Sequence, residues 1–272
     1  MDLTTVESYR RALTRADLAL APGERILAGG TWWYSEANRD ITGLVDLTTM
    51  GWEPITASNA GLEIAATCTI ARIVALPQRP GWSAQPLFAQ CANALLASFK
   101  IWNEATVGGN ICRAYAAGAM IAATVTLDAT ATIWTPDGGQ RRTPVASLVA
   151  GNGVSTLGAG EVLRSVLVPA SALTSRTAIR KIALAEHGRS GAVLTGRVDT
   201  DGAATFVVTA ATERPRVLRY DNMPTAATLD ADAAALDGYY SDAFGAADWR
   251  RHVSRTLLAE VRDELAPAGV TR

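Results

Sequence analysis

The chain has 272 residues, of which 49% are hydrophobic, and its formal net charge at pH 7 is −1. This hydrophobic fraction is enough to build a sizeable buried core. The near-zero charge argues against a nucleic acid as the main partner, because such partners select a basic surface. Residues 1–17 lack an apolar stretch, and no apolar run reaches the ~18 residues of a membrane span. We therefore expect a cytoplasmic protein.

The metal-binding residue types are few and dispersed. Cys68, Cys91 and Cys112 form no CxxC pair, and the two histidines, His187 and His252, lie far apart in the sequence. This spacing argues against a cysteine-ligated iron–sulfur cluster or a zinc site within the chain. We expect three free thiols in a reducing compartment.

The first fifth of the chain predicts a small β-α-β unit. Thr4 and Glu7 fit a capping box, which predicts a helix over residues 8–16. The remaining elements expected here are a strand at 25–28, a helix at 34–39 and a strand at 44–47.

From residue 55 onwards the pattern predicts a larger mixed unit. Strands are expected at 62–66, 129–134 and 162–168, and helices at 69–76, 84–98 and 117–127. Residues 105–111 are expected to form a glycine-containing loop, and Asp137-Gly138-Gly139 a turn. Residues 170–176 are expected to be a linker.

The last hundred residues predict antiparallel strands followed by helices. Strands are expected at 178–184, 192–198 and 205–211, and Asp199-Thr200-Asp201-Gly202 is a good hairpin turn between the last two. Helices are expected near 230–236 and 246–265. The fold class is therefore α+β, with a domain over 1–170 (subdomains of about 1–52 and 53–170) and a C-terminal domain over 177–272.

Two Gly-Gly loops carry the strongest chemical signal. They are Ala28-Gly29-Gly30-Thr31 and Thr106-Val107-Gly108-Gly109-Asn110. A pyrophosphate needs backbone N–H groups at close range, which glycine allows because it has no Cβ and tolerates positive φ. Neither loop has the Rossmann or P-loop spacing. One Gly-Gly is often a plain tight turn, but two beside strand or helix ends favour a split anion site.

Several stretches around and beyond these loops follow one another in a recognisable order. Residues 27–31 read Leu-Ala-Gly-Gly-Thr, and 43–47 read Gly-Leu-Val-Asp-Leu. Residues 102–111 read Trp-Asn-Glu-Ala-Thr-Val-Gly-Gly-Asn-Ile, followed by Thr-Leu-Asp-Ala at 126–129. Their order resembles the FAD-binding (medium) subunits of the molybdenum hydroxylases, the family of xanthine dehydrogenase and carbon monoxide dehydrogenase. Supporting similarities lie at 160–166, 180–182 and 248–253.

The resemblance implies a two-subdomain, PCMH-like FAD-binding fold followed by a C-terminal domain of three antiparallel strands with helices. It implies non-covalent FAD, with the pyrophosphate on the two Gly-Gly loops. By position, the cofactor-binding residues are expected to be Ala28, Gly29, Gly30, Thr31, Trp32, Trp33, Thr106, Val107, Gly108, Gly109, Asn110, Ile111, Leu163 and Lys181. Trp32 and Trp33 are either a stacking platform or core. Lys181 is either a flavin contact or a solvated strand-end residue.

Three positions depart from the family pattern. Trp102 stands where the family usually has Arg, and Ala119 where it often has Asp. Residues 188–191 read Gly-Arg-Ser-Gly, where many members carry a large apolar or aromatic side chain. The first departure affects local packing. The other two concern the hydrogen bonding and shielding of the flavin.

The function implied by the resemblance is electron transfer within a heteromeric oxidoreductase. We expect electrons to pass from iron–sulfur clusters of a partner subunit through FAD to an external acceptor, with substrate oxidation in a molybdopterin subunit. No residue of this chain is expected to be catalytic by itself or to bind a metal. One alternative is a stand-alone FAD-dependent oxidase or reductase of related fold. Another is a scaffold subunit that has lost FAD.

Overall fold

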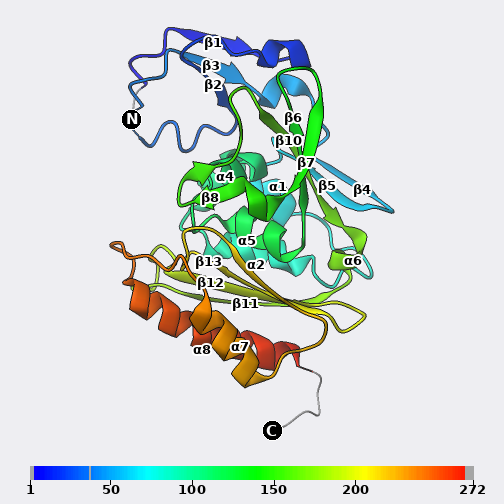
Figure 1. The fold of residues 1–272 in the computed structure, drawn as a ribbon. Coiled ribbons are helices and arrows are strands. Elements are labelled where there is room, and N and C mark those ends of the chain that lie inside the picture. The colour runs from blue at the N-terminus through cyan, green and yellow to red at the C-terminus, as the bar shows by residue number, and fades with distance from the viewer. Residues whose placement is uncertain (1–2, 37, 267–272) are drawn as a thin grey trace.

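The computed structural model describes residues 3–36 and 38–266 (Figure 1). In the described residues, three main β-sheets follow one another along the molecule in chain order, and a fourth sheet is a two-stranded hairpin. The small N-terminal sheet lies at one end, and the C-terminal sheet with its two helices lies at the other (Figure 1). Among the described helices, none is long and apolar enough to cross a membrane.

The N-terminal sheet has three parallel strands in the order β1-β3-β2. They are β1 (Ser8–Arg11), β2 (Glu24–Leu27) and β3 (Gly43–Asp46), with 3-10 turns at Arg15–Leu18 and Thr48–Met50. The prediction of a helix over 8–16 is wrong, because residues 8–11 pair with β3 and the only described helical turn near this range is the 3-10 turn that begins at Arg15. Turns occupy residues 31–35, where the predicted helix over 34–39 would begin; residue 37 lies outside the described residues.

The middle of the chain forms a five-stranded antiparallel sheet in the order β4-β5-β10-β6-β7. Its strands are β4 (Ile55–Ser58), β5 (Gly61–Ala65), β6 (Thr130–Trp134), β7 (Gln140–Pro144) and β10 (Val162–Pro169). A small hairpin, β8 (Val149–Gly151) and β9 (Val154–Ser155), follows a 3-10 turn at Val145–Leu148. The expected strands at 62–66, 129–134 and 162–168 are confirmed.

Five helices accompany this sheet. They are α1 (Ile70–Val74), α2 (Pro86–Ala94), α3 (Phe99–Glu104), α4 (Val107–Cys112) and α5 (Ala119–Thr126). The prediction of a loop at 105–111 is wrong: despite two glycines, α4 forms there because Thr106 caps it. The predicted helix over 84–98 is too long, since α2 ends at Ala94. The expected linker at 170–176 instead holds α6 (Ala170–Leu173) and the start of the next strand.

The C-terminal part forms a four-stranded antiparallel sheet in the order β11-β12-β13-β14. Its elements are β11 (Arg176–Ile182), β12 (Ala192–Val198), β13 (Ala204–Thr209), β14 (Arg216–Tyr220), α7 (Ala226–Ala235) and α8 (Ala247–Leu265). The prediction of three strands missed β14. Helices α7 and α8 cover the face of this sheet that points away from the rest of the molecule (Figure 1).

Helix α5 joins the middle sheet to the C-terminal sheet. All eight of its residues are buried, and it contacts both β12 and β13. At its end, Thr126 and Thr195 hydroxyls lie 2.5 Å apart, and Arg197 donates to the Thr126 carbonyl over 3.0 Å. Arg197, only 5% exposed, also pairs with Asp128. This buried network fixes the C-terminal sheet against the segment that carries α4 and α5.

Candidate functional site

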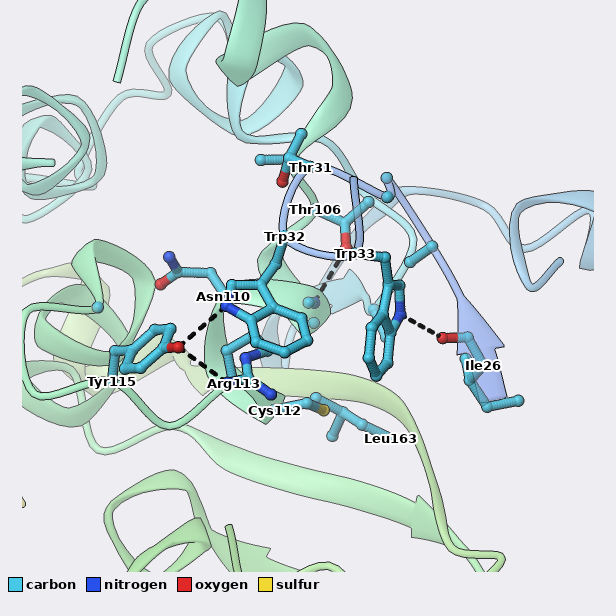
Figure 2. Close-up of a pocket in the computed structure, with 18 of the residues that line it drawn as sticks. Ile26, Thr31, Trp32, Trp33, Thr106, Asn110, Cys112, Arg113, Tyr115 and Leu163 are labelled. Atoms are coloured by element: carbon cyan, nitrogen blue, oxygen red, sulfur yellow. Dashed lines mark hydrogen bonds between the residues drawn. The ribbon is translucent and has the colours of Figure 1, made fainter. Parts of the chain in front are cut away.

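A pocket of about 690 Å³ opens where the N-terminal sheet meets the middle of the molecule. This volume is typical of small-molecule and cofactor sites. Its walls are mostly apolar and come from segments that are far apart in the sequence. They lie within residues 20–35, 94–118, 157–163 and 189–190, with Leu47 and Ala66 between them. Figure 2 shows the part of the wall around the loop after β2.

The loop after β2 presents a row of unpaired backbone N–H groups. Within residues 3–36 and 38–266, the N–H groups of residues 29–33 donate no hydrogen bond to the protein. All five of these residues line the pocket. Gly30 has a φ of +68°, which glycine adopts without strain. Successive N–H groups in such a turn form an anion-binding concavity.

Gly29 brings this loop close to the end of α3. A Cβ atom at Gly29 would lie 1.7 Å from the carbonyl oxygen of Glu104. No side chain fits in that space, so only glycine lets the two backbones approach in this way. The first Gly-Gly loop is thereby placed next to the second, as expected for a site made from both.

The N–H groups of the second Gly-Gly loop are already used. Val107 donates to the Cys68 carbonyl over 2.8 Å, Gly108 to the Ala66 carbonyl over 3.0 Å, and Gly109 to the Thr106 hydroxyl oxygen over 3.0 Å. Of the two loops expected to offer backbone N–H groups to an anion, the structure therefore leaves a row of unpaired N–H groups only in the first. The physical reason is that α4 needs these bonds to begin where it does.

The second loop instead contributes space and a side chain. A Cβ at Gly108 would lie 2.4 Å from Ala66, so this glycine packs against the end of β5. A Cβ at Gly109 would meet only the Thr106 hydroxyl, at 2.9 Å, and otherwise faces open space. Asn110 accepts from the Met120 N–H over 2.9 Å through Oδ1. That bond leaves its amide Nδ2 as a donor in the pocket wall.

Both tryptophans of the first loop lie in the pocket wall and are anchored through their indole N–H groups. Trp33 donates to the Ile26 carbonyl over 3.0 Å, and Trp32 donates to the Tyr115 hydroxyl over 2.9 Å (Figure 2). Their rings meet edge to face with centroids 4.8 Å apart. They are therefore ordered wall residues of the pocket and not part of a sealed core.

The wall carries more positive than negative charge. Arg25, Arg113 and Arg189 line the pocket, and Glu161 is the one acidic residue among its described lining residues. Glu161 is already paired with Arg141 over 2.6 Å, and that hydrogen bond lowers the pKa of its carboxyl. The pocket is therefore suited to an anionic ligand.

The thiol of Cys112, in the pocket wall, is unreactive as a nucleophile. Burial raises the pKa of Cys112 to about 12. The group is therefore protonated at neutral pH and is a poor nucleophile, because the thiolate is the reactive form. This is compatible with a cofactor that is held without a covalent bond.

Eleven of the fourteen expected cofactor-binding residues line this pocket and three do not. Val107 and Ile111 are buried in the core beneath α4, with 1% and 0% of their surface exposed. Lys181 lies on the exposed side of β11, where its ammonium group donates to the Asn93 carbonyl over 3.2 Å. The structure brings together the residues of both Gly-Gly loops and Leu163, but not Lys181.

Two of the departures noted in the sequence lie near the pocket. Ala119 is buried at the start of α5 and is not part of the pocket wall. Ser190 does line the pocket and donates to the Ala94 carbonyl over 2.8 Å. This bond holds the segment after β11 against the last residue of α2, so Ser190 closes one side of the wall.

Other wall residues were missed by the sequence reasoning. They come from the segment between α2 and α3 (Leu95, Leu96 and Ala97), from α3 (Ile101) and from the turn after α4 (Arg113 and Tyr115). The first group sits in a stretch whose apolar pattern reads as continuous helix. The second depends on Ala114, which has a positive φ of 52° that no local sequence signal indicates.

Comparisons with known proteins identify the class to which this fold and site belong. Residues 3–171 match the family model described as the FAD binding domain in molybdopterin dehydrogenase. This match spans more than half of the chain, and the chain belongs to that family. It is an FAD-binding chain of an oxidoreductase, and FAD is its cofactor. No curated protein sequence matches the chain.

Solved structures with the same fold come from enzymes of this class. A chain of quinoline 2-oxidoreductase from Pseudomonas putida 86 has a TM-score of 0.81 at 23% identity, covering 97% of this chain and 98% of that one. A chain of carbon monoxide dehydrogenase from Hydrogenophaga pseudoflava has a TM-score of 0.81 at 18% identity, with 96% and 97% covered. A chain of Cu,Mo-CO dehydrogenase has a TM-score of 0.83 at 20% identity, with 96% and 98% covered. The two-part FAD-binding fold expected from the sequence is confirmed.

Proposed function

We propose that this chain carries FAD in a molybdenum hydroxylase complex, receives electrons from the iron–sulfur clusters of a partner chain and passes them to an external acceptor. Bound FAD supplies the redox chemistry, since it can take up and release electrons. The observation that carries the proposal is the row of unpaired N–H groups at residues 29–33, which line a net-positive pocket in a chain of this family.

The residues of the pocket fit the cofactor in distinct ways. The N–H groups of residues 29–33 would hold the diphosphate, and the Thr31 hydroxyl and Asn110 amide would add donors. Gly109 would leave room for the cofactor to approach α4. Leu163, buried at the start of β10 and part of the pocket wall, would contact the flavin. Val107 and Ile111 would act only by supporting α4, and Lys181 is not part of the proposed site.

The chain's own contribution is positioning. The mostly apolar wall would exclude water from the ring system, while the unpaired N–H groups of residues 29–33 and the guanidinium of Arg113 lie at the first loop. The protonated Cys112 thiol would leave the cofactor non-covalently bound. Within this proposal the complex lies in the cytoplasm, and the substrate is bound by the molybdopterin subunit.

The partnership can be tested by purifying the full chain from its own host through an affinity tag. We expect an iron–sulfur protein and a molybdopterin protein to co-elute, with iron and molybdenum in constant ratio to flavin. The flavin of the complex should be reduced by its substrate, whereas the flavin of the separated chain should not. A flavin-loaded chain that elutes without iron or molybdenum and turns over alone would instead support the stand-alone oxidase or reductase.

A further inference from the structure

We infer that Arg113, in the turn after α4, is a diphosphate-binding residue whose guanidinium serves as counter-ion to the phosphates of FAD. The inference rests on the proposed cofactor site and adds to it a residue that neither Gly-Gly loop contains. Its partner is defined by chemistry: an anion with several oxygens, as a diphosphate is.

Arg113 is held against the first Gly-Gly loop. Its Cζ lies 3.5 Å from the centroid of the Trp32 ring and 4.9 Å from that of Tyr115. Its Nη2 donates to the Tyr115 hydroxyl over 3.0 Å, and the same hydroxyl accepts from the Trp32 indole over 2.9 Å. Figure 2 shows the three side chains facing one another in the pocket wall. The guanidinium is thus fixed beside the loop that carries the unpaired N–H groups.

The hydrogen-bonding capacity of Arg113 is largely unmet. A guanidinium has five N–H donors, and the bond to Tyr115 is the one its side chain makes to a described residue. Its Nε is buried without a partner, and the structure pairs it with no carboxylate among residues 3–36 and 38–266. The side chain is partly buried and lines the pocket, so an anion bound there would accept the hydrogen bonds that the protein leaves unmade.

The surroundings indicate what that counter-ion is. The acidic wall residue Glu161 is already engaged by Arg141, so it is not the partner of Arg113. A planar guanidinium binds phosphate oxygens through two parallel N–H groups, which a lysine does not. Stacking on Trp32 occupies the face of that plane and not its edge. On that edge Nη1 makes no bond to a described residue, and Nη2 has a second N–H besides the one donated to Tyr115. The unpaired N–H groups of residues 29–33, in the loop that carries Trp32, provide further donors for the same anion.

The test is the affinity of the full-length apo-chain for FAD and for riboflavin, which lacks phosphates, followed by fluorescence titration. For Arg113→Gln we expect FAD to bind about 10- to 100-fold more weakly, since one charge-assisted contact is lost. Riboflavin should bind as it does to the unchanged chain. Arg113→Lys, which keeps the charge, should recover part of the FAD affinity.

The matched control is Arg164→Gln. Arg164 also stacks on a tryptophan, with its Cζ 4.4 Å from the Trp52 centroid, but does not line the pocket. Its loss should leave both affinities unchanged. Equal FAD affinity in Arg113→Gln and the unchanged chain would overturn the inference, as would a parallel loss of FAD and riboflavin binding. If the unchanged chain binds no FAD at all, the proposed function fails, and the inference fails with it.

Discussion

A side chain at Gly109 would test whether this residue only shapes α4 or also leaves room for the cofactor. Its φ is not in the positive range, its N–H is held by Thr106, and a Cβ would meet only the Thr106 hydroxyl. We therefore expect Gly109→Val to fold, while its branched side chain occupies space that the cofactor needs. FAD should bind at least about tenfold more weakly, which corresponds to roughly 1.4 kcal/mol.

The control for this prediction is Gly139→Val in the turn between β6 and β7. A Cβ at Gly139 would also meet a threonine hydroxyl, that of Thr135 at 3.2 Å, but this turn lies outside the pocket. Its FAD affinity should match that of the unchanged chain, even if its melting temperature falls. Equal affinities in both variants, measured by titration of the folded apo-proteins, would show that Gly109 only shapes a helix.

At the scale of residues, the glycines in the sequence predicted where the pocket lies. The sequence did not predict the pocket residues that depend on contacts between distant parts of the chain. The Gly-Gly pairs mark real close approaches at Gly29 and Gly108, which is why the pattern was informative. It did not reveal which N–H groups stay free, because that depends on Thr106 and on the carbonyls of Ala66 and Cys68, just after β5. Arg113 was missed because its stacking partner, Trp32, lies 81 residues earlier in the chain.

At the scale of elements, one ion pair connects the two outer strands of the N-terminal sheet. Arg10 on β1 and Glu24 on β2 are bonded over 2.7 Å. They meet across β3, where Gly43 leaves room: a Cβ there would lie 2.9 Å from Glu24 Cγ. Hydrogen bonds from Arg10 and the Ala21 N–H lower the pKa of Glu24 to about 2, from an ordinary value of 4.5.

This pair predicts an acid-dependent loss of stability. Since the folded pKa of Glu24 is depressed, its stabilisation is fully present above pH 4.5 and is lost as pH falls towards about 2. Glu24→Gln should lower the free energy of unfolding by about 1–2 kcal/mol at pH 7, an amount moderated by the partial exposure of Arg10. The difference should shrink between pH 4.5 and 2. Urea unfolding at several pH values measures it, with Glu53→Gln, an exposed carboxylate, as control.

A constant difference in the free energy of unfolding between the Glu24→Gln and unchanged chains across this pH range would contradict the assigned ion pair.

The same region shows why the secondary-structure prediction failed locally. Thr4 and Glu7 carry the letters of a capping box, yet residues 8–11 form β1, because a parallel partner was available in β3. Local propensity is overridden there by pairing with residues more than thirty positions away.

Elements with strong local patterns were predicted well. The strand Ala192–Val198 and the helix Ala247–Leu265 agree with expectation almost residue for residue. The missed strand β14 carries arginines at Arg216 and Arg219, which pair with Asp237 and Asp128. The alternation of apolar and polar residues in β14 is therefore obscured by arginines whose ion-pair partners lie far away in the sequence.

At the scale of the whole molecule, the three main sheets are formed by three successive segments of the chain. Residues 8–46 form the first sheet, 55–169 the second and 176–220 the third. The domain boundaries at about 52 and at 170–177 stay a prediction. The segment between the second and third sheets is not a loose connection: Ser175 is buried and its hydroxyl lies 2.5 Å from Asp199 Oδ1.

The central claim is that this pocket binds FAD. It is tested most directly by denaturing the purified full chain, or its complex, and identifying the released flavin by chromatography. We expect about one FAD per chain, released without proteolysis because the cofactor is held by non-covalent contacts. Release of FMN, or no flavin after reconstitution with FAD, would contradict the account.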